Sequence, residues 1–143
     1  MKVNIKRIDK SLPIPEYKTK GAVGFDFYTR EDAVVKPGEA VLIPLNIIFK
    51  VPKGYVLSII PRSSTPKKGL IIPNSPGTID QDYCGDEDEL KVWAYNFTKK
   101  KIIVEKGERI CQGILYKVGI AKFAEVKKMS SKSRGGFGTT GHK

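Results

Sequence analysis

Apolar and polar residues alternate along much of this chain with the two-residue period of a β-strand. The clearest run extends from Val41 to Val51, where every second residue is apolar and the other positions include Pro44, Asn46 and Lys50. This pattern predicts one strand with a buried face and a wetter face. Shorter runs rich in Val, Ile, Tyr and Phe predict further strands at Val3–Ile8, Phe25–Thr29, Tyr55–Ile60, Leu90–Phe97, Lys101–Glu105, Arg109–Val118 and Lys122–Val126.

Turn-forming residues separate these runs. Glycine occurs in each of the connecting segments Lys36–Glu39, Val51–Gly54 and Glu105–Glu108, and the first two also contain proline. Helical periodicity is almost absent, and the one helical turn that we predict spans Thr65–Lys68, with Thr65 as N-cap and Pro66 at the first helical position. Many short strands separated by turns are typical of an all-β sandwich or barrel.

The length of 143 residues fits one compact domain, and the composition changes only near the end. From Lys127 to Lys143 the chain has five Lys or Arg, four Gly and no acidic residue. Such a segment buries little apolar area. We therefore expect a β-barrel domain over residues 1–126 and a flexible glycine-rich arm over residues 127–143.

The net charge points to an anionic partner. Lys and Arg number 26 against 15 Asp and Glu, which gives a formal charge of +11. The longest stretch without a charged residue has eleven residues, from Gly69 to Ile79, which is too short to span a bilayer. The N-terminus also lacks the apolar segment of a signal peptide. We therefore expect a cytoplasmic protein that does not bind membranes.

Cysteine and histidine usage excludes several kinds of catalytic site. Cys84 and Cys111 form no CxxC motif, and we expect both to be reduced thiols. His142, the second-last residue, is the single histidine, so a Ser-His-Asp triad or a histidine-ligated zinc site has no histidine in the folded body. Acid–base chemistry would have to come from a carboxylate, Tyr or Lys.

Two segments carry candidate carboxylates. In the first, Gly21–Phe27, Asp26 lies at the start of a predicted strand behind two glycines. In the second, Asn74–Gly85, a Pro-Gly turn is followed by Asp80, Asp82 and Tyr83. Either segment could supply a general base, although Asp residues next to turns also cap backbone groups for purely structural reasons.

Three further segments suit an anionic ligand. Arg62, Ser63 and Ser64 precede the predicted helical turn, where free N–H groups favour an anion, and Gln112 interrupts an otherwise apolar strand. The last segment, Arg134–Gly141, combines glycines, hydroxyls and one aromatic ring. It is not a Walker A loop, because His142-Lys143 replaces the Lys-Ser/Thr pair and the chain ends there.

Together, in this order, the five segments resemble the five motifs of the homotrimeric dUTPase family, in its bacterial-like form, over residues 21 to 141. The family patterns are A-G-x-D-L, P-R-S, G-x-I-D-x-x-Y-x-G, G-x-R-I-x-Q and G-G-F-G-[S/T]-T-G. The resemblance implies a β-barrel with jelly-roll character, assembled as a homotrimer with three active sites at subunit interfaces. Each site would take the third motif from one chain, the first, second and fourth from a neighbour, and the arm from the third chain.

The resemblance also implies the reaction, a Mg²⁺-dependent hydrolysis of dUTP to dUMP and pyrophosphate by attack of water at the α-phosphorus. This activity limits uracil incorporation into DNA and supplies dUMP for dTMP synthesis. By the same resemblance, Asp80 deprotonates the attacking water, and Tyr83 packs against the deoxyribose and excludes a 2′-hydroxyl. The uracil edge would be recognised by Asn74 and the backbone of Gly77, Thr78 and Ile79.

The other motifs would bind the metal and the phosphate chain. Asp26 would reach Mg²⁺ indirectly, through a coordinated water, and Arg62, Ser63, Ser64 and Gln112 would line the phosphates. In the arm, Phe137 would stack on the uracil, and Gly138, Thr139 and Thr140 would contact the terminal phosphate. We take Arg134 as the phosphate-binding cation of the arm, with Lys132 as the alternative because the family commonly places an Arg five residues before the Phe.

The chain departs from the family pattern after Tyr83, where an acidic run, Asp86–Glu89, lengthens the hairpin. We expect these four acids to point to solvent. Two other functions remain open at this point: a dCTP deaminase-type relative, and a basic all-β nucleic-acid-binding module. The motif pattern favours the dUTPase reading, with no specific nucleic-acid partner.

Overall fold

The computed structural model describes residues 1–136 and 139, and its body is built from antiparallel β-strands. The longest pairing joins β6 (Tyr55–Pro61) to β11 (Cys111–Lys117), with Pro61 opposite Cys111 and Tyr55 opposite Lys117. The strand β2 (Phe25–Asp26) pairs with the other edge of β11, and β8 (Gly77–Ile79) pairs with the other edge of β6. The order in this sheet is therefore β2-β11-β6-β8.

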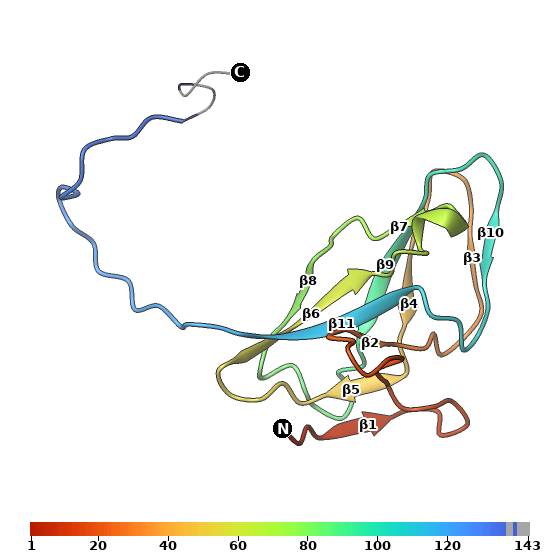
Figure 1. The fold of residues 1–143 in the computed structure, drawn as a ribbon. Helices are drawn as coiled ribbons and strands as arrows, with labels where there is room; N and C mark the ends of the chain where they lie inside the picture. Colours follow the sequence, from red (N-terminus) through yellow and green to blue (C-terminus); the bar gives the residue numbers. More distant parts are fainter. Residues whose placement is uncertain (137–138, 140–143) are drawn as a thin grey trace.

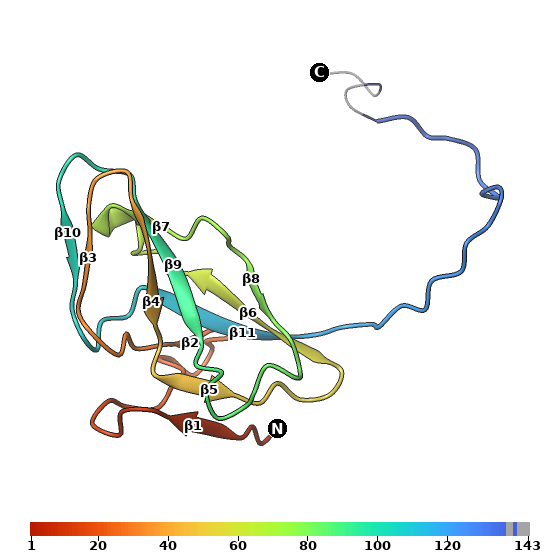
Figure 2. The same ribbon diagram turned by 180° about the vertical axis from the view of Figure 1, so that it is seen from behind.

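A second sheet has the order β4-β9-β7 and consists of Ala40–Pro44, Lys91–Asn96 and Leu70–Ile71. Two further pairs complete the body: β1 (Ile5–Arg7) with β5 (Ile47–Phe49), and β3 (Ala33–Val35) with β10 (Ile102–Val104). Figures 1 and 2 show these pairs arranged around one body. The core contains side chains from both sheets, including Ile43, Leu57, Ile59 and Val92. The expected all-β barrel with jelly-roll character is thus confirmed.

The three predicted turns are present. Gly38, Gly54 and Gly107 have φ values of 72°, 79° and 81°, a left-handed conformation that glycine adopts at little cost. The helical turn is a short 3₁₀ element, η1 (Pro66–Lys68), with Thr65 before it. The Thr65 side chain does not cap this turn. Its hydroxyl accepts a hydrogen bond from the Arg62 N–H and donates one to the Ile110 carbonyl, which ties the end of β6 to β11.

The prediction of a single strand from Val41 to Val51 is wrong. The chain breaks between β4 and β5 at Asn46, which is buried and has a φ of 62°. Its side-chain amide accepts from the Asp9 N–H at 2.6 Å and donates to the Asp9 carbonyl at 2.9 Å, and these bonds stabilise the unusual backbone conformation. Pro44 and Asn46 are buried, so the predicted wetter face is not exposed at these positions.

The strand predicted at Lys122–Val126 is also not formed. Directly after β11, the Val118 N–H donates a hydrogen bond to the Gly54 carbonyl, and the chain then runs away from the body (blue in Figures 1 and 2). Phe123 is 94% exposed because no other part of this chain covers it. Conversely, the sequence did not predict β3, β7 and β8, which have only two or three residues each.

In the part of the chain that the structure describes, no helix has the length and apolar character needed to cross a bilayer.

Candidate active site

Asp26 is a buried carboxylate held by two arginines. It lies at the end of β2, directly opposite Gln112 of β11, and is 6% exposed. Its Oδ1 lies 2.9 Å from Arg62 Nε, and its Oδ2 lies 2.8 Å from Arg109 Nη1. A buried charge requires compensation of this kind. Because a carboxylate has about four acceptor positions, Asp26 can still accept hydrogen bonds from a ligand or a water molecule.

Arg62 connects three parts of the chain. It follows directly after β6, which ends at Pro61, and its Nη1 donates to the Arg109 carbonyl at 3.0 Å. Together with the Thr65 hydroxyl bonds, this contact fixes the segment that carries Ser63 and Ser64, whose side chains are exposed. The predicted residues of the second motif therefore lie next to Asp26, with both hydroxyls available to a ligand.

Gln112 lies beside this carboxylate and is partly buried. Its Nε2 donates to the Pro61 carbonyl at 3.1 Å, which satisfies the polar side chain within the sheet. A Cβ atom at Gly24 would lie 2.5 Å from Gln112 Oε1, so any other residue there would displace the end of the Gln112 side chain. A depression of about 190 Å³ is lined by Lys18, Thr19, Ala22, Gly24, Asp26, Arg62, Ser63 and Gln112.

Sequence reasoning did not select Arg109 as a site residue. The G-x-R pattern of the fourth motif contained it, but the direction of its side chain could not be read from the sequence. It lies just before β11 and reaches back to Asp26. A second, larger depression of about 570 Å³ adjoins this arginine and contains further cations. It is lined by Arg62, Ser64, Thr65, Lys67, Lys68, Gly107, Glu108, Arg109 and Ile110.

The third motif forms β8 and the loop that follows it. Asn74, Gly77, Thr78 and Ile79 line one small depression of about 100 Å³. Pairing of β8 with β6, in which Ile79 stands opposite Leu57, holds this edge in place. The remaining walls come from Ile59, Ile72, Lys91 and Val92.

Asp80 follows directly after β8 and is exposed. It lies at a depression of about 630 Å³ that also includes Tyr55, Ile79 and Gln81. Gln81 Nε2 donates to the Tyr55 carbonyl at 3.0 Å and so ties the start of the loop to β6. Tyr83, farther along the loop, is 40% exposed, and its hydroxyl lies 3.4 Å from the Glu89 carbonyl, to which it donates.

The expectation that all four acids of the Asp86–Glu89 run point to solvent is wrong for Glu89. Asp86 and Glu87 are exposed, whereas Asp88 Oδ2 accepts from the Gly85 N–H at 2.6 Å. Glu89 is 8% exposed, and its Oε1 accepts from Arg30 Nε at 2.8 Å and from the Asn46 N–H at 2.9 Å. The physical reason is that Glu89 compensates a partly buried arginine and an otherwise unpaired backbone donor.

The described arm residues lie away from the site residues of the body. Lys132, Arg134 and Thr139 are exposed, and the segment that carries them extends away from the body (Figure 1). The predicted uracil-stacking and phosphate-contacting residues Phe137, Gly138 and Thr140 lie outside the described residues.

The site residues thus form two groups at different depressions of the body, apart from Tyr83, which lines none of the depressions described above. The first group, the phosphate group, consists of Asp26, Arg62, Ser63, Ser64 and Gln112. The second group, the uridine group, consists of Asn74, Gly77, Thr78, Ile79, Asp80 and Tyr83. Among residues 1–136 and 139, no cluster of three or more His, Cys, Asp or Glu is arranged to hold a metal ion. A divalent cation at this site would therefore need ligands from a substrate and from water.

Comparison with known proteins places these motifs in one family. The family model described as dUTPase matches residues 10–141. The chain is 42% identical over 144 residues to the deoxyuridine 5'-triphosphate nucleotidohydrolase of Nautilia profundicola, covering 99% of each protein.

Two solved structures show the same fold. The dUTPase of Staphylococcus bacteriophage 80alpha, solved with dUpNHpp, superimposes with a TM-score of 0.86 at 24% identity, covering 98% of both chains. The dUTPase of Streptococcus mutans superimposes with a TM-score of 0.76 at 29% identity, covering 83% of this chain and 98% of the other. Sequence motifs, full-length similarity and fold agree, and the chain belongs to the dUTPase family.

Proposed function

We propose that this protein hydrolyses dUTP to dUMP and pyrophosphate. The observation that carries the proposal is the division of the motif residues into two chemically distinct groups. The phosphate group combines two arginines, two exposed hydroxyls and a buried carboxylate. The uridine group combines a small depression of mixed polar and apolar lining with an exposed aspartate and a half-exposed tyrosine. A nucleoside triphosphate has matching parts, a sugar and base with weakly polar faces and a hydrogen-bonding base edge, joined to a polyanion.

The uridine group recognises the base and the sugar. Asn74 and the backbone of Gly77, Thr78 and Ile79 bind the uracil edge, because an amide and backbone groups can match its alternating donors and acceptors. The exposed ring of Tyr83 packs against the deoxyribose. A ribose hydroxyl at that contact would be buried against the ring without a hydrogen-bond partner, which disfavours UTP.

The phosphate group binds the triphosphate. Arg62 presents a planar guanidinium suited to bidentate phosphate contact, and the Ser63 and Ser64 hydroxyls lie next to it in the chain. Arg62 is preorganised, because its Nε contacts Asp26 and its Nη1 contacts the Arg109 carbonyl. Fixed positive charge stabilises the negative charge that develops on the phosphoryl oxygens during the reaction.

Asp80 acts as the general base. It is exposed at the end of β8, one residue after the part of the strand that binds the uracil, so its carboxylate is free to orient a water molecule. It removes a proton from this water as the oxygen attacks the α-phosphorus, and pyrophosphate leaves. Loss of such a base lowers the rate by roughly 100-fold or more.

Mg²⁺ is the cofactor that the site fits. Both Asp26 oxygens are already engaged by arginine, Oδ2 as the acceptor of a hydrogen bond from Arg109 and Oδ1 in an ion pair with Arg62, so this carboxylate suits a water-mediated contact with the ion better than direct ligation. Its remaining acceptor positions lie in the depression next to Ser63 and Gln112. Mg²⁺ keeps several waters and prefers phosphate oxygens. When bound, the ion neutralises phosphate charge and makes the α-phosphorus more electrophilic.

A homotrimer brings the two groups together. Each chain carries both groups at separate depressions, and the uridine group of one chain can face the phosphate group of its neighbour. The chain also exposes apolar surface that suits burial by further copies: Ile120, Phe123 and Met129 are 84%, 94% and 75% exposed on the extended C-terminal segment.

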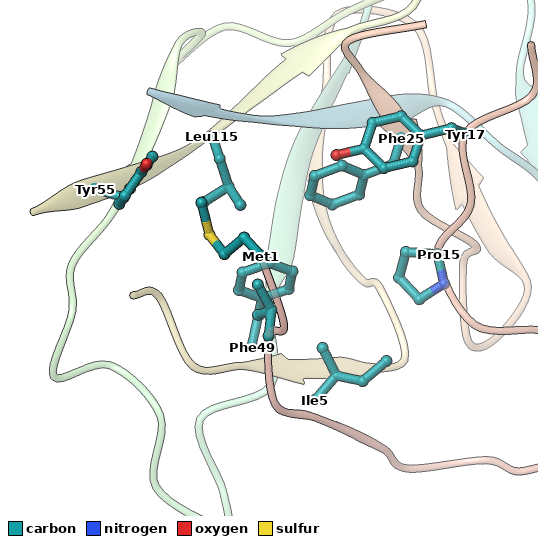
Figure 3. A pocket seen from close by; sticks show the side chains of 9 residues that line it. Met1, Ile5, Pro15, Tyr17, Phe25, Phe49, Tyr55 and Leu115 are labelled. Carbon is teal, nitrogen blue, oxygen red and sulfur yellow. The ribbon is translucent and has the colours of Figure 1, made fainter. Parts of the chain in front are cut away.

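The body offers an apolar surface that could receive such side chains. A depression of about 550 Å³ is lined by residues from several strands, among them Ile5, Phe25, Phe49, Tyr55 and Leu115. Figure 3 shows these side chains. The assembly therefore covers apolar surface on the segment after β11, and it places the arm of one chain over a site formed by the other two. Arg134 is the cation that the arm supplies, and Phe137, Gly138, Thr139 and Thr140 complete the contacts to base and terminal phosphate.

The test is pyrophosphate release from dUTP, UTP, dTTP and dCTP, each with and without Mg²⁺, on one purified sample. We expect hydrolysis of dUTP alone, and only with Mg²⁺. Ammonia release from dCTP would instead assign a deaminase activity. No hydrolysis of any nucleotide would refute the proposed function, and a steep salt dependence of binding to plain DNA would then support a nucleic-acid-binding module.

A further inference from the structure

We infer that Glu89 is a positioning residue for Tyr83 and thereby sets the discrimination between dUTP and UTP. The inference rests on the proposed function. Asp26 and Glu89 are the buried acids among the described residues, and the reaction scheme above uses only Asp26. Glu89 belongs to an acidic run whose other members are more exposed, so its burial requires a specific reason.

Glu89 fixes the end of the loop that carries Asp80 and Tyr83. Its Oε1 accepts from Arg30 Nε at 2.8 Å and from the Asn46 N–H at 2.9 Å. The next residue, Leu90, donates to the Ile47 carbonyl at 2.8 Å and accepts from the Leu45 N–H at 2.9 Å. The chain at residues 89–90 is thus bound to the bend between β4 and β5 by side-chain and backbone bonds together.

The fixed backbone contacts Tyr83 directly. The Tyr83 hydroxyl donates to the Glu89 carbonyl at 3.4 Å, so the orientation of the ring depends on where that carbonyl lies. Part of the Tyr83 side chain remains accessible to a ligand, because the residue is 40% exposed. A ring that excludes a single hydroxyl by steric contact must be held to within a fraction of an ångström. The Arg30–Glu89 ion pair supplies this rigidity from behind the loop.

The other anchor of the loop acts on a different residue. Gln81 is bound to the Tyr55 carbonyl at 3.0 Å, and it lies next to Asp80. Loss of the Glu89 anchor should therefore disturb Tyr83 more than Asp80. This predicts a change in sugar discrimination, measured as the ratio of kcat/KM for dUTP to kcat/KM for UTP, rather than a simple loss of kcat.

The experiment compares full-length variants by this ratio. Glu89→Ala should lower it by about tenfold or more, chiefly through a raised KM for dUTP and improved use of UTP. Glu89→Gln keeps an acceptor of the same shape and should retain most of the wild-type ratio. Asp86→Asn is the matched control, because it removes an acid of the same loop whose 2.7 Å ion pair with Lys6 is exposed, and it should leave the ratio unchanged.

A purely structural role for Glu89 gives a different result. Partial unfolding reduces the amount of active enzyme, which lowers the rates for both nucleotides equally and leaves the ratio unchanged. An unchanged ratio in Glu89→Ala would therefore overturn the inference. If Glu89→Ala does not fold, Tyr83→Phe decides the question, because it removes only the hydroxyl that contacts Glu89 and keeps the ring.

Tyr83→Phe should lower the ratio as Glu89→Ala does, and a wild-type ratio in Tyr83→Phe would overturn the inference. Where both single variants fold, the double variant should lower the ratio no further than either alone, since both act through one contact. Failure of the proposed function is distinct from all these outcomes, because the wild-type protein would then not hydrolyse dUTP.

Discussion

The Asp26 carboxylate and the Arg62 guanidinium form a largely buried ion pair, with 2.9 Å between Oδ1 and Nε. Arg109 binds the second oxygen of the same carboxylate at 2.8 Å. One buried charge thereby orders two arginines from different parts of the chain, one after β6 and one before β11. The phosphate group owes its preorganisation to this arrangement, and the first prediction follows from it.

Arg109→Met should lower the free energy of unfolding by about 2 kcal/mol, because it leaves Asp26 Oδ2 without its charged donor. Denaturant unfolding at fixed protein concentration measures the change. Lys36→Met is the control, since the Lys36–Glu39 pair is exposed and its atoms lie 3.9 Å apart. That variant should change stability by less than about 0.5 kcal/mol. Equal effects of the two substitutions would contradict the buried role of Arg109.

Gly24→Ala should impair dUTP hydrolysis. The added methyl group would lie 2.5 Å from Gln112 Oε1, so the end of the Gln112 side chain must shift from its place beside Asp26. We expect kcat/KM for dUTP to fall by about tenfold or more. In Gly21→Ala, a control from the same motif, the methyl group meets no atom within 4 Å, and activity should be retained. A fully active Gly24→Ala enzyme would show that the position of Gln112 is unimportant.

Asp80→Asn should abolish turnover while dUTP still binds. The substitution removes the base but keeps the size of the side chain, so kcat should fall by roughly 100-fold or more. Steady-state kinetics and equilibrium binding of dUTP measure the two effects separately. Asp82→Asn, two residues along the same exposed loop, should retain activity. More than about one tenth of wild-type kcat in Asp80→Asn would exclude Asp80 as the base.

The two thiols should differ in reactivity. Cys111 is fully buried in β11, and burial raises its pKa far above the usual range, with the nearby Asp26 charge adding to the shift. Since the thiolate is the reactive form, raising the pH to about 9 should not make Cys111 react with a thiol reagent in the native protein. Cys84 is partly exposed and should react. Titration with a thiol reagent should detect one reactive thiol in the native protein and two in the denatured protein. Reaction of two thiols in the native state would refute the prediction.

Most strands and turns could be predicted from local sequence pattern, whereas the features that were predicted wrongly depend on residues far away in the chain. The strands β6 and β11, though not their pairing, and the turns at Gly38, Gly54 and Gly107 are visible in short windows of sequence. The break at Asn46 is stabilised by Asp9, and the burial of Glu89 depends on Arg30. No window of ten residues contains either relationship.

The site followed from the order of its motifs rather than from their spacing. Each of the five motif segments, taken alone, could also have had a purely structural role. Only their combination in one chain indicated the family. The role of Arg109 depended on a side-chain direction, and the separation of the two site groups depended on the sheet order β2-β11-β6-β8. Neither feature could be predicted from the residue types in the motifs.

The central claim is that the uridine group of one chain and the phosphate group of another form one active site. The direct test mixes Asp80→Asn with Arg62→Gln, two variants each expected to be nearly inactive, and refolds them together at equal concentration. If sites are shared between chains, about one quarter of them combine an intact Asp80 with an intact Arg62, and about that share of wild-type dUTP hydrolysis should return. Activity no higher than that of the separately refolded variants would contradict the account, because it would place both residues of each site in the same chain.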